Sequence, residues 1–163
     1  ARSISLAMES EPKTSACTAT PEKLKLGSQL CFALYSTLHG VNRVYRRLLA
    51  DLDLTYPQYL VLLVLWEKDE VGVGEICEAL FLETATLTPL LKRLEARGLI
   101  LRRRSAEDER RVIVTLTAEG RALRARAECI PDRIAAAAGW SLDDLIDLRG
   151  KLIALRTNLT TAD

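Results

Sequence analysis

The chain has 163 residues, of which 48% are hydrophobic and 28% are charged, and its formal net charge is +1. These values are typical of a globular protein with one domain, or one domain with a dimerisation extension. The longest apolar run, Leu60 to Trp66, is too short to cross a bilayer, and the N-terminus lacks the apolar core of a secretory signal. The sequence therefore predicts a cytoplasmic protein that does not use the membrane.

Four cysteines lie at positions 17, 31, 77 and 129, and in a reducing compartment they start out as thiols. Their spacing is not that of paired metal ligands, and His39 is the only histidine. The sequence therefore predicts no metal site and no cofactor. A cysteine in this setting is either buried filler or chemically active.

The N-terminal 21 residues are rich in Ser, Thr, Glu and Pro and have no apolar period, which predicts a disordered tail over residues 1–21. Met8 is interpreted as the native start. A long helix is expected from about Pro21 to Ala50, because apolar residues recur at helical spacing. A mean helix has roughly eleven residues, so a helix of this length is expected to pack against a partner subunit. Residues 22–53 are assigned to this dimerisation and sensor helix.

Residues 54–117 are predicted to form a DNA-binding domain. Thr55 can cap a helix that has Pro57 in its first turn and carries the apolar run. A short helix is expected over Glu75 to Leu80, and a second one runs from about Thr84 to Arg97, with Gly98 at the C-cap.

Two strands, Leu99 to Arg103 and Val112 to Leu116, are expected to follow as a hairpin with a charged tip. Residues 118–163 are assigned to C-terminal dimerisation helices, the first broken at Pro131 and the last capped by Ser141. The last helix is expected to turn these side chains inward: Leu145, Ile146, Leu148, Leu152, Ile153 and Leu155. The expected fold is mainly α with a small β-hairpin wing, a winged helix-turn-helix with N- and C-terminal dimerisation helices.

The segment from Lys92 to Arg111 contains eight basic and four acidic residues, a basic stretch inside a nearly neutral chain. Such a stretch indicates nucleic-acid binding, although a solvated charged face is the alternative. The helix that begins at Thr84 is expected to enter the major groove of a double-stranded DNA operator. The faces of this helix that do not carry leucines hold the candidate DNA contacts, which are Thr84, Thr86, Thr88, Pro89, Lys92 and Arg93. Thr84 is alternatively an N-cap, and Thr88 alternatively bonds only its own helix.

The tip of the hairpin holds Asp108, Arg110 and Arg111. An arginine at such a tip can enter the minor groove. Asp108 is expected to orient an arginine through a carboxylate–guanidinium bond. The alternative is that all three are ordinary surface charges.

Four motifs resemble the MarR family: LTPLLKRLE from Leu87, GLI from Gly98, DERR from Asp108 and LTAEG from Leu116. Their order and spacing agree with the family, and the resemblance covers about residues 22–160. It implies a homodimeric transcriptional repressor, not an enzyme, in which the terminal helices of two subunits interlock. The two recognition helices would read a pseudo-palindromic operator about one helical turn apart.

Cys31, Tyr35 and Tyr45 share one stripe of the first helix, each tyrosine about 40° from the cysteine at 100° per residue. Along a straight helix, however, Tyr45 lies about 21 Å from Cys31. An antiparallel copy of the helix across a dimer axis would bring Tyr45 to Cys31, and Tyr56 would arrive by the same route. Tyrosine hydroxyls that donate hydrogen bonds to sulfur stabilise a thiolate.

The run QLCFALY from Gln29, with Tyr45 and Tyr56 at their spacings, resembles the organic-hydroperoxide-sensing branch of the MarR family. The resemblance implies that Cys31 is the redox sensor, that Tyr45 and Tyr56 are its hydrogen-bond partners, and that an organic hydroperoxide is the inducer. Tyr35 is a weaker candidate for the same shell. Some members have a resolving cysteine in a C-terminal dimerisation helix, and Cys129 lies in that region, which implies an intersubunit Cys31–Cys129 disulfide.

Three other interpretations stay open. A MarR-type repressor released by a small phenolic or aromatic ligand would use the same interface, with Cys31 incidental. A thiol peroxidase would use the two cysteines, but its basic wing would have no purpose. A non-specific architectural DNA binder is disfavoured by the nearly neutral net charge.

Overall fold

A computed structural model describes residues 21–108 and 110–161 of the chain. The predicted tail, including the start assigned to Met8, lies outside the described residues except for Pro21. The chain divides between Leu38 and His39 into two compact units. Each unit is described by itself below.

The N-terminal unit shows that the expected helix over residues 21–50 was predicted too long at its start. Two short 3-10 helices, Pro21–Leu24 and Leu26–Ser28, precede helix α1, which spans Leu30–Leu48. Gln29 has extended backbone angles, and its side-chain amide donates to the Lys25 carbonyl at 3.2 Å. That carbonyl would accept the Gln29 backbone N–H in a continuous α-helix, but here the Gln29 N–H donates to the Leu26 carbonyl at 3.1 Å and the side chain bonds Lys25 instead.

The second unit contains the predicted helix-turn-helix. Helix α2 (Tyr56–Glu67) begins where expected, because the Gln58 side-chain oxygen accepts the Thr55 N–H at 2.9 Å. Helix α3 (Val73–Leu80) begins two residues earlier than predicted. Helix α4 spans Thr84–Ala96, which confirms the predicted second helix of the motif.

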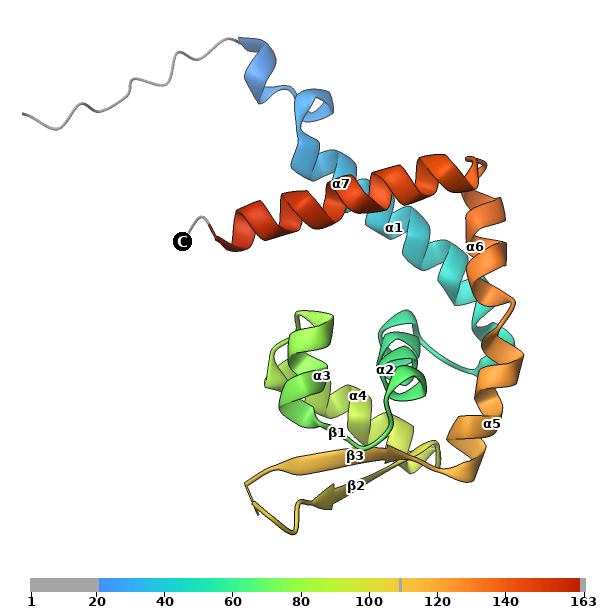
Figure 1. The fold of residues 1–163 in the computed structure, drawn as a ribbon. Helices are drawn as coiled ribbons and strands as arrows, with labels where there is room; N and C mark the ends of the chain where they lie inside the picture. The colour runs from blue at the N-terminus through green and yellow to red at the C-terminus, as the bar shows by residue number, and fades with distance from the viewer. Residues whose placement is uncertain (1–20, 109, 162–163) are drawn as a thin grey trace, which may run out of the picture. The chain divides into compact units, whose positions relative to one another are not determined.

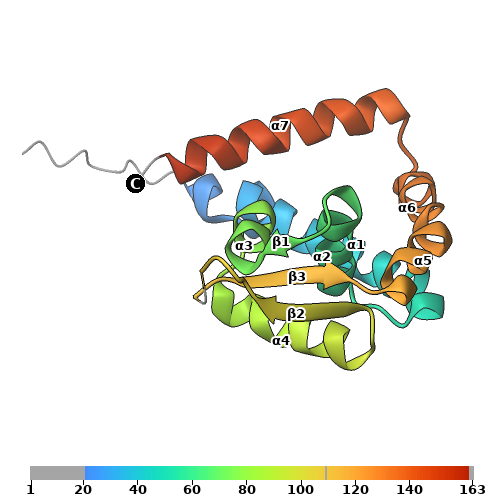
Figure 2. The ribbon, with the colours of Figure 1, turned by 60° about the horizontal axis from the view of Figure 1, so that its bottom comes forward.

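The wing is a three-stranded antiparallel sheet in the order β1-β3-β2 (Figures 1 and 2). Strands β2 (Ile100–Arg104) and β3 (Val112–Leu116) form the predicted hairpin, with β2 shifted by one residue from its expected bounds. Strand β1 (Val71–Gly72) pairs with the middle of β3 and was not predicted. Gly98, with φ of 69°, makes the left-handed turn that sends the chain from α4 into β2, as its C-cap position predicted.

The hydrophobic core lies between α2, α3, α4 and the sheet. On α4, Leu87, Leu91 and Leu94 are buried, whereas Leu90 is partly buried. Their spacing of three and four residues keeps one stripe of α4 against α2 and the sheet. The opposite stripe is left for the side chains that were predicted to contact DNA.

Three helices follow the wing: α5 (Ala118–Ala127), α6 (Ile130–Ala138) and α7 (Leu142–Thr160). The predicted break at Pro131 is confirmed, because proline occupies the first turn of α6. The Ser141 cap is also confirmed, since its hydroxyl accepts the Asp144 N–H at 3.1 Å. The expectation that α7 turns its apolar face inward is wrong within one chain. Helix α7 has no buried residue, and these side chains are exposed: Ile146, Leu148, Leu152 and Ile153.

Candidate DNA interface and redox site

Helix α4 presents polar and cationic side chains on the face opposite its buried leucines. Five of the six candidate contacts are exposed: Thr84, Thr86, Pro89, Lys92 and Arg93. Thr88 is half-buried, and its hydroxyl donates to the Thr84 carbonyl at 2.8 Å, so the alternative that it bonds its own helix is realised. The N-cap residue is Glu83, so the alternative cap role of Thr84 is wrong. The Thr84 hydroxyl instead lies 3.7 Å from the Cys77 sulfur of α3.

The tip of the wing holds the predicted carboxylate–arginine pair. Asp108 Oδ1 lies 3.2 Å from Arg110 Nε and also accepts the Arg110 backbone N–H at 3.0 Å. The guanidinium of Arg110 is otherwise exposed, so the pair fixes its base and leaves its outer edge open. Arg111 is placed differently, because its guanidinium lies 3.4 Å from the Glu75 carboxylate of α3.

Three further carboxylates attach the wing to the rest of the unit. Glu95 of α4 receives the Arg102 guanidinium and also accepts the Arg102 backbone N–H at 3.1 Å. Glu70 pairs with Arg103 at 2.6 Å. Asp69 accepts the Leu116 N–H at 2.9 Å. These carboxylates were not identified from the sequence, because each pairs with a strand or helix that only folding brings close.

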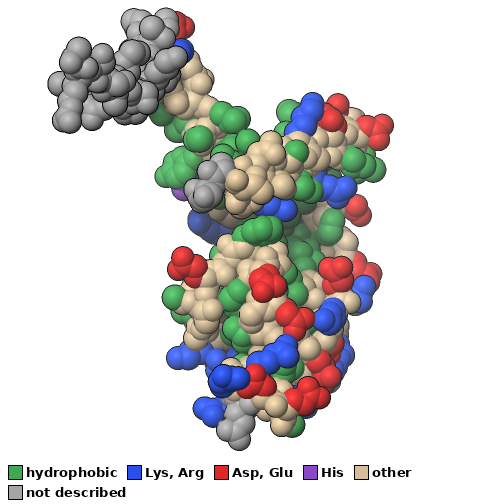
Figure 3. All heavy atoms as spheres, turned by 60° about the vertical axis from the view of Figure 1, so that its left-hand side comes forward, with side chains coloured by type: hydrophobic (Ala, Val, Ile, Leu, Met, Phe, Trp, Pro, Cys, Tyr) green, Lys and Arg blue, Asp and Glu red, His purple; other side chains and the backbone are tan. Residues whose placement is uncertain are grey.

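The pKa values of these carboxyl groups report the same contacts. The hydrogen bond from the Arg102 side chain lowers the pKa of Glu95, and the hydrogen bond from Lys68 lowers the pKa of Glu75. Burial alone would raise the pKa of Asp69, but the N–H groups of Leu116 and Glu70 and the Arg121 side chain outweigh it and lower the pKa. All three groups are therefore held as carboxylates at neutral pH. Figure 3 shows the resulting mixture of basic and acidic side chains over the lower part of the molecule, where the hairpin lies.

The candidate sensor Cys31 lies in the first turn of α1, in the N-terminal unit, and its thiol is exposed. The side chains around it on this helix are mostly apolar and also exposed, among them Leu30 at 59% and Leu38 at 53%. Tyr35 is 62% exposed. Exposed apolar side chains in this number are typical of a surface that another chain covers.

The other predicted tyrosines lie in the second unit and form an aromatic row. The rings of Tyr45 and Tyr56 stack with centroids 4.2 Å apart, and Tyr59 lies 6.0 Å from Tyr45. Burial, followed by the neighbouring phenols of Tyr56 and Tyr59, raises the pKa of Tyr45 to about 12, and burial also raises the pKa of Tyr56. Both phenols therefore keep their protons at neutral pH and can donate hydrogen bonds.

Cys129 is exposed and occupies the N-cap position of α6. Burial, then Tyr56, then Cys129 raise the pKa of Tyr59. Tyr59 itself is only 2% exposed and belongs to the core.

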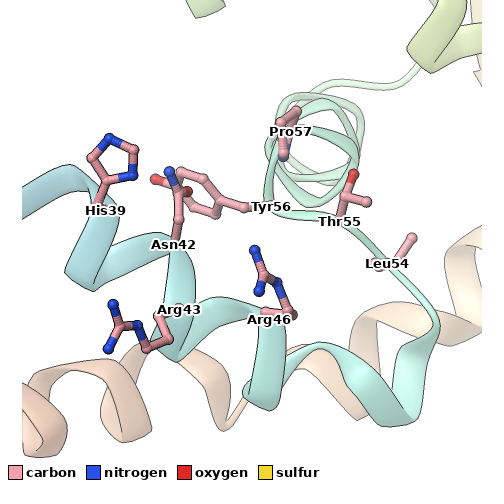
Figure 4. Close-up of a pocket in the computed structure, with 8 residues that line it drawn as sticks. All are labelled: His39, Asn42, Arg43, Arg46, Leu54, Thr55, Tyr56 and Pro57. Atoms are coloured by element: carbon pink, nitrogen blue, oxygen red, sulfur yellow. The ribbon is translucent and has the colours of Figure 1, made fainter.

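A pocket of about 480 Å³ lies beside Tyr56 and the start of α2. Figure 4 shows His39 and Asn42 rising from α1 on the side of Tyr56, while Arg46 points toward the start of α2 and Arg43 points away from it. The pocket therefore combines a protonated phenol with cationic side chains, a lining that suits an anionic or strongly polar group.

The part of the chain that the structure describes contains no group of three or more His, Cys, Asp or Glu side chains arranged to hold a metal ion. Within the same residues, no helix is both long and apolar enough to cross a membrane.

Known proteins are similar to this chain in architecture and in sequence. The profile of the family described as "Transcriptional regulator SarA/Rot" matches residues 43–126. The organic hydroperoxide resistance transcriptional regulator of Bacillus subtilis is 44% identical over 138 residues, which cover 85% of this chain and 94% of the relative. The chain belongs to the MarR/SarA family of winged-helix transcriptional regulators.

Two further similar proteins agree with this assignment. The HTH-type transcriptional regulator TtmR of Methylorubrum extorquens is 48% identical over 142 residues, which cover 87% of this chain and 73% of the relative. The solved structure of reduced AbfR bound to DNA matches with a TM-score of 0.74 and 33% identity, covering 86% of this chain and 96% of AbfR. The predicted fold class is thereby confirmed, and the chain is a DNA-binding transcriptional regulator.

Proposed function

We propose that the chain is a homodimeric repressor that leaves its operator when an organic hydroperoxide oxidises Cys31. The observation that carries the proposal is the stacked pair of protonated phenols Tyr45 and Tyr56. Tyr56 lines a pocket with cationic side chains, and the Cys31 thiol of the chain is exposed. The relative from Bacillus subtilis, named for organic hydroperoxide resistance, supports the choice of inducer.

The proposed dimer is supported by two apolar surfaces that a single chain leaves open. Helix α1 exposes Leu30, Leu34 and Leu38, and helix α7 exposes a second set that includes Leu152 and Ile153. Burial of such side chains gains about 25 cal/mol for each Å² removed from water. Residues 22–53 and 118–163 are therefore assigned to dimerisation, and residues 54–117 to DNA binding.

In the proposed dimer, the partner's Cys31 reaches the pocket beside Tyr56. The Tyr45 and Tyr56 hydroxyls donate hydrogen bonds to its sulfur, and the guanidinium of Arg46 adds a favourable charge. These contacts favour the thiolate, which is the form of cysteine that attacks peroxides. The sequence offered no cation within one turn of Cys31, and the pocket supplies one from the other end of α1.

The proposed chemistry consumes one hydroperoxide for each Cys31. The thiolate attacks the terminal oxygen, the O–O bond breaks, and one proton is taken up, so that Cys31–S⁻, ROOH and H⁺ give Cys31–SOH and ROH. The Cys129 thiol of the facing subunit then attacks the sulfenic sulfur, forming a disulfide and releasing water. Both steps change the contacts at the dimer interface and thereby the separation of the two α4 helices.

On DNA, α4 is assigned to the major groove and the wing to the minor groove. Lys92 and Arg93 are assigned to phosphate or guanine, and the exposed threonines to base edges and phosphates. Arg110, held at its base by Asp108, is assigned to the minor groove. Arg111 needs to leave or share Glu75 before it can contact DNA.

The test is operator binding by the reduced protein before and after hydroperoxide, with Cys31→Ser and the matched control Cys77→Ser. Wild type and Cys77→Ser are expected to release DNA, whereas Cys31→Ser stays bound. Release of all three proteins would instead indicate a small-ligand repressor. Continuous turnover of hydroperoxide with a thiol reductant would indicate a peroxidase.

A further inference from the structure

Five arginines of the wing can be compared for their ion pairs with the carboxylates that the structure describes. Arg102 is paired with Glu95, Arg103 with Glu70, and Arg111 with Glu75; Arg110 is paired within the tip. Among residues 21–108 and 110–161, no carboxylate partner is found for the exposed guanidinium of Arg104. Among the described carboxylates, four arginines of the wing therefore have partners that partly compensate their charge, and Arg104 has none.

The alternation of side chains along β2 determines the face of the strand on which the Arg104 side chain lies. Successive residues of a strand point to opposite faces, so Arg104 shares its face with Ile100 and Arg102. Ile100 is buried in the core, and Arg102 contacts Glu95 of α4, so this is the face that looks toward α4. Arg103, on the other face, turns instead to Glu70.

The position along β2 places Arg104 at the DNA end of the wing. The strand runs back alongside α4, away from the C-terminal end of the helix, and Arg104 is its last residue (Figure 2). The start of α4 is the part that carries the exposed threonines. Arg104 thus lies between the recognition helix and the tip of the wing, where a duplex held by both elements presents its phosphates.

We propose that Arg104 binds a backbone phosphate of the operator and supplies the wing's main contribution to the salt dependence of binding. When an arginine without a carboxylate partner binds a phosphate, a counterion is released from the DNA and no ion pair within the protein has to be broken. A paired arginine such as Arg103 gains less, because its ion pair must be broken or shared. The inference rests on the family's DNA binding and is independent of peroxide sensing.

The experiment measures affinity against salt concentration for the reduced full-length protein and a labelled duplex obtained by in vitro selection with that protein. Each phosphate contact on duplex DNA contributes about 0.9 to the slope of log K against log salt. Arg104→Gln is therefore expected to flatten the slope by about 0.9 per subunit bound. Arg104→Gln should bind DNA more weakly than wild type at low salt. When the salt concentration rises from 50 to 200 mM, this difference in affinity should become about 3.5-fold smaller per subunit.

Two variants control the experiment. Arg103→Gln removes a neighbouring arginine of the same strand that is paired with Glu70, and its slope is expected to change by less than half as much. Arg104→Lys keeps the charge and is expected to keep the wild-type slope. Circular dichroism and the thermal midpoint verify folding of each variant. A wild-type slope for Arg104→Gln, or an equal loss for Arg103→Gln, would overturn the proposal, and neither result would bear on release by hydroperoxide.

Discussion

Gly120→Ala is predicted to destabilise the protein, because the first turn of α5 touches the backbone that leads into β2. A Cβ atom built on Gly120 would lie 2.0 Å from the Leu99 carbonyl oxygen and 3.2 Å from a Leu116 methyl group. The same Leu99 oxygen accepts the Thr117 N–H at 3.1 Å, and the Gly120 carbonyl accepts the Trp66 indole N–H at 2.9 Å. A methyl group therefore forces α5 away from a hydrogen-bonded backbone, not from a flexible side chain.

The magnitude follows from two contributions. Forcing an extra methyl group into a packed site costs about 1–3 kcal/mol. Loss of the Thr117 or Trp66 hydrogen bond costs about 1 kcal/mol more. The expected loss in the free energy of unfolding is therefore about 2–4 kcal/mol, and a chain of this size loses roughly 2–4 °C in Tm for each kcal/mol.

The assay is urea unfolding of the reduced protein followed by far-UV circular dichroism, at one fixed protein concentration for all variants. Gly74→Ala is the matched control, since it lies in helix α3 and nothing lies within 4 Å of the position that the added methyl group would take. It is expected to be neutral or to stabilise by up to about 1 kcal/mol. Equal midpoints for Gly120→Ala and wild type would refute the close approach of α5 to Leu99.

Four further predictions follow from the contacts described above. Tyr56→Phe should slow the reaction of Cys31 with hydroperoxide, measured as loss of free thiol in stopped flow, and leave the DNA affinity of the reduced protein unchanged. Glu95→Gln should lower the free energy of unfolding by about 1–2 kcal/mol, because Arg102 loses a charged partner; an unchanged urea midpoint would contradict this. Ile153→Asp should shift the protein toward monomer in analytical ultracentrifugation, whereas an intact dimer would place the interface elsewhere. The pKa of Tyr45 is raised from 10.0 to about 12, so its contribution to stability is complete below pH 10 and is lost as the pH rises through 12. Urea midpoints should fall across that window in wild type and fall less in Tyr45→Phe.

Local chemistry explains which parts of the fold were predictable. The starts of α2 and α7 and the turn at Gly98 were located from single residues, because caps and left-handed turns depend on a few neighbouring atoms. Strand β1 has two residues and no periodic signal, and it exists through its pairing with Val114 and Ile113. The first helix starts later than predicted because the Gln29 side chain bonds a carbonyl that the pattern assigned to the helix.

The candidate site was predictable to a similar degree. The faces of α4 followed from helical spacing, and the Asp108–Arg110 pair followed from a two-residue separation. The pairs Glu70–Arg103 and Glu75–Arg111 join residues 33 and 36 positions apart, which no local pattern relates. The apolar stripe of α7 was predicted from helical spacing. Spacing alone does not determine whether the same chain or a partner covers such a stripe, and in one chain it is exposed.

The most direct test of the account is a titration of the operator-bound, reduced protein with an organic hydroperoxide. DNA release by fluorescence anisotropy and the Cys31–Cys129 disulfide on a non-reducing gel are followed in the same samples. Release is expected to be complete at about one equivalent per subunit and to parallel disulfide formation, and a thiol reductant is expected to restore binding. Release that requires a large excess, or that occurs while the Cys31 thiol remains free, would contradict the account.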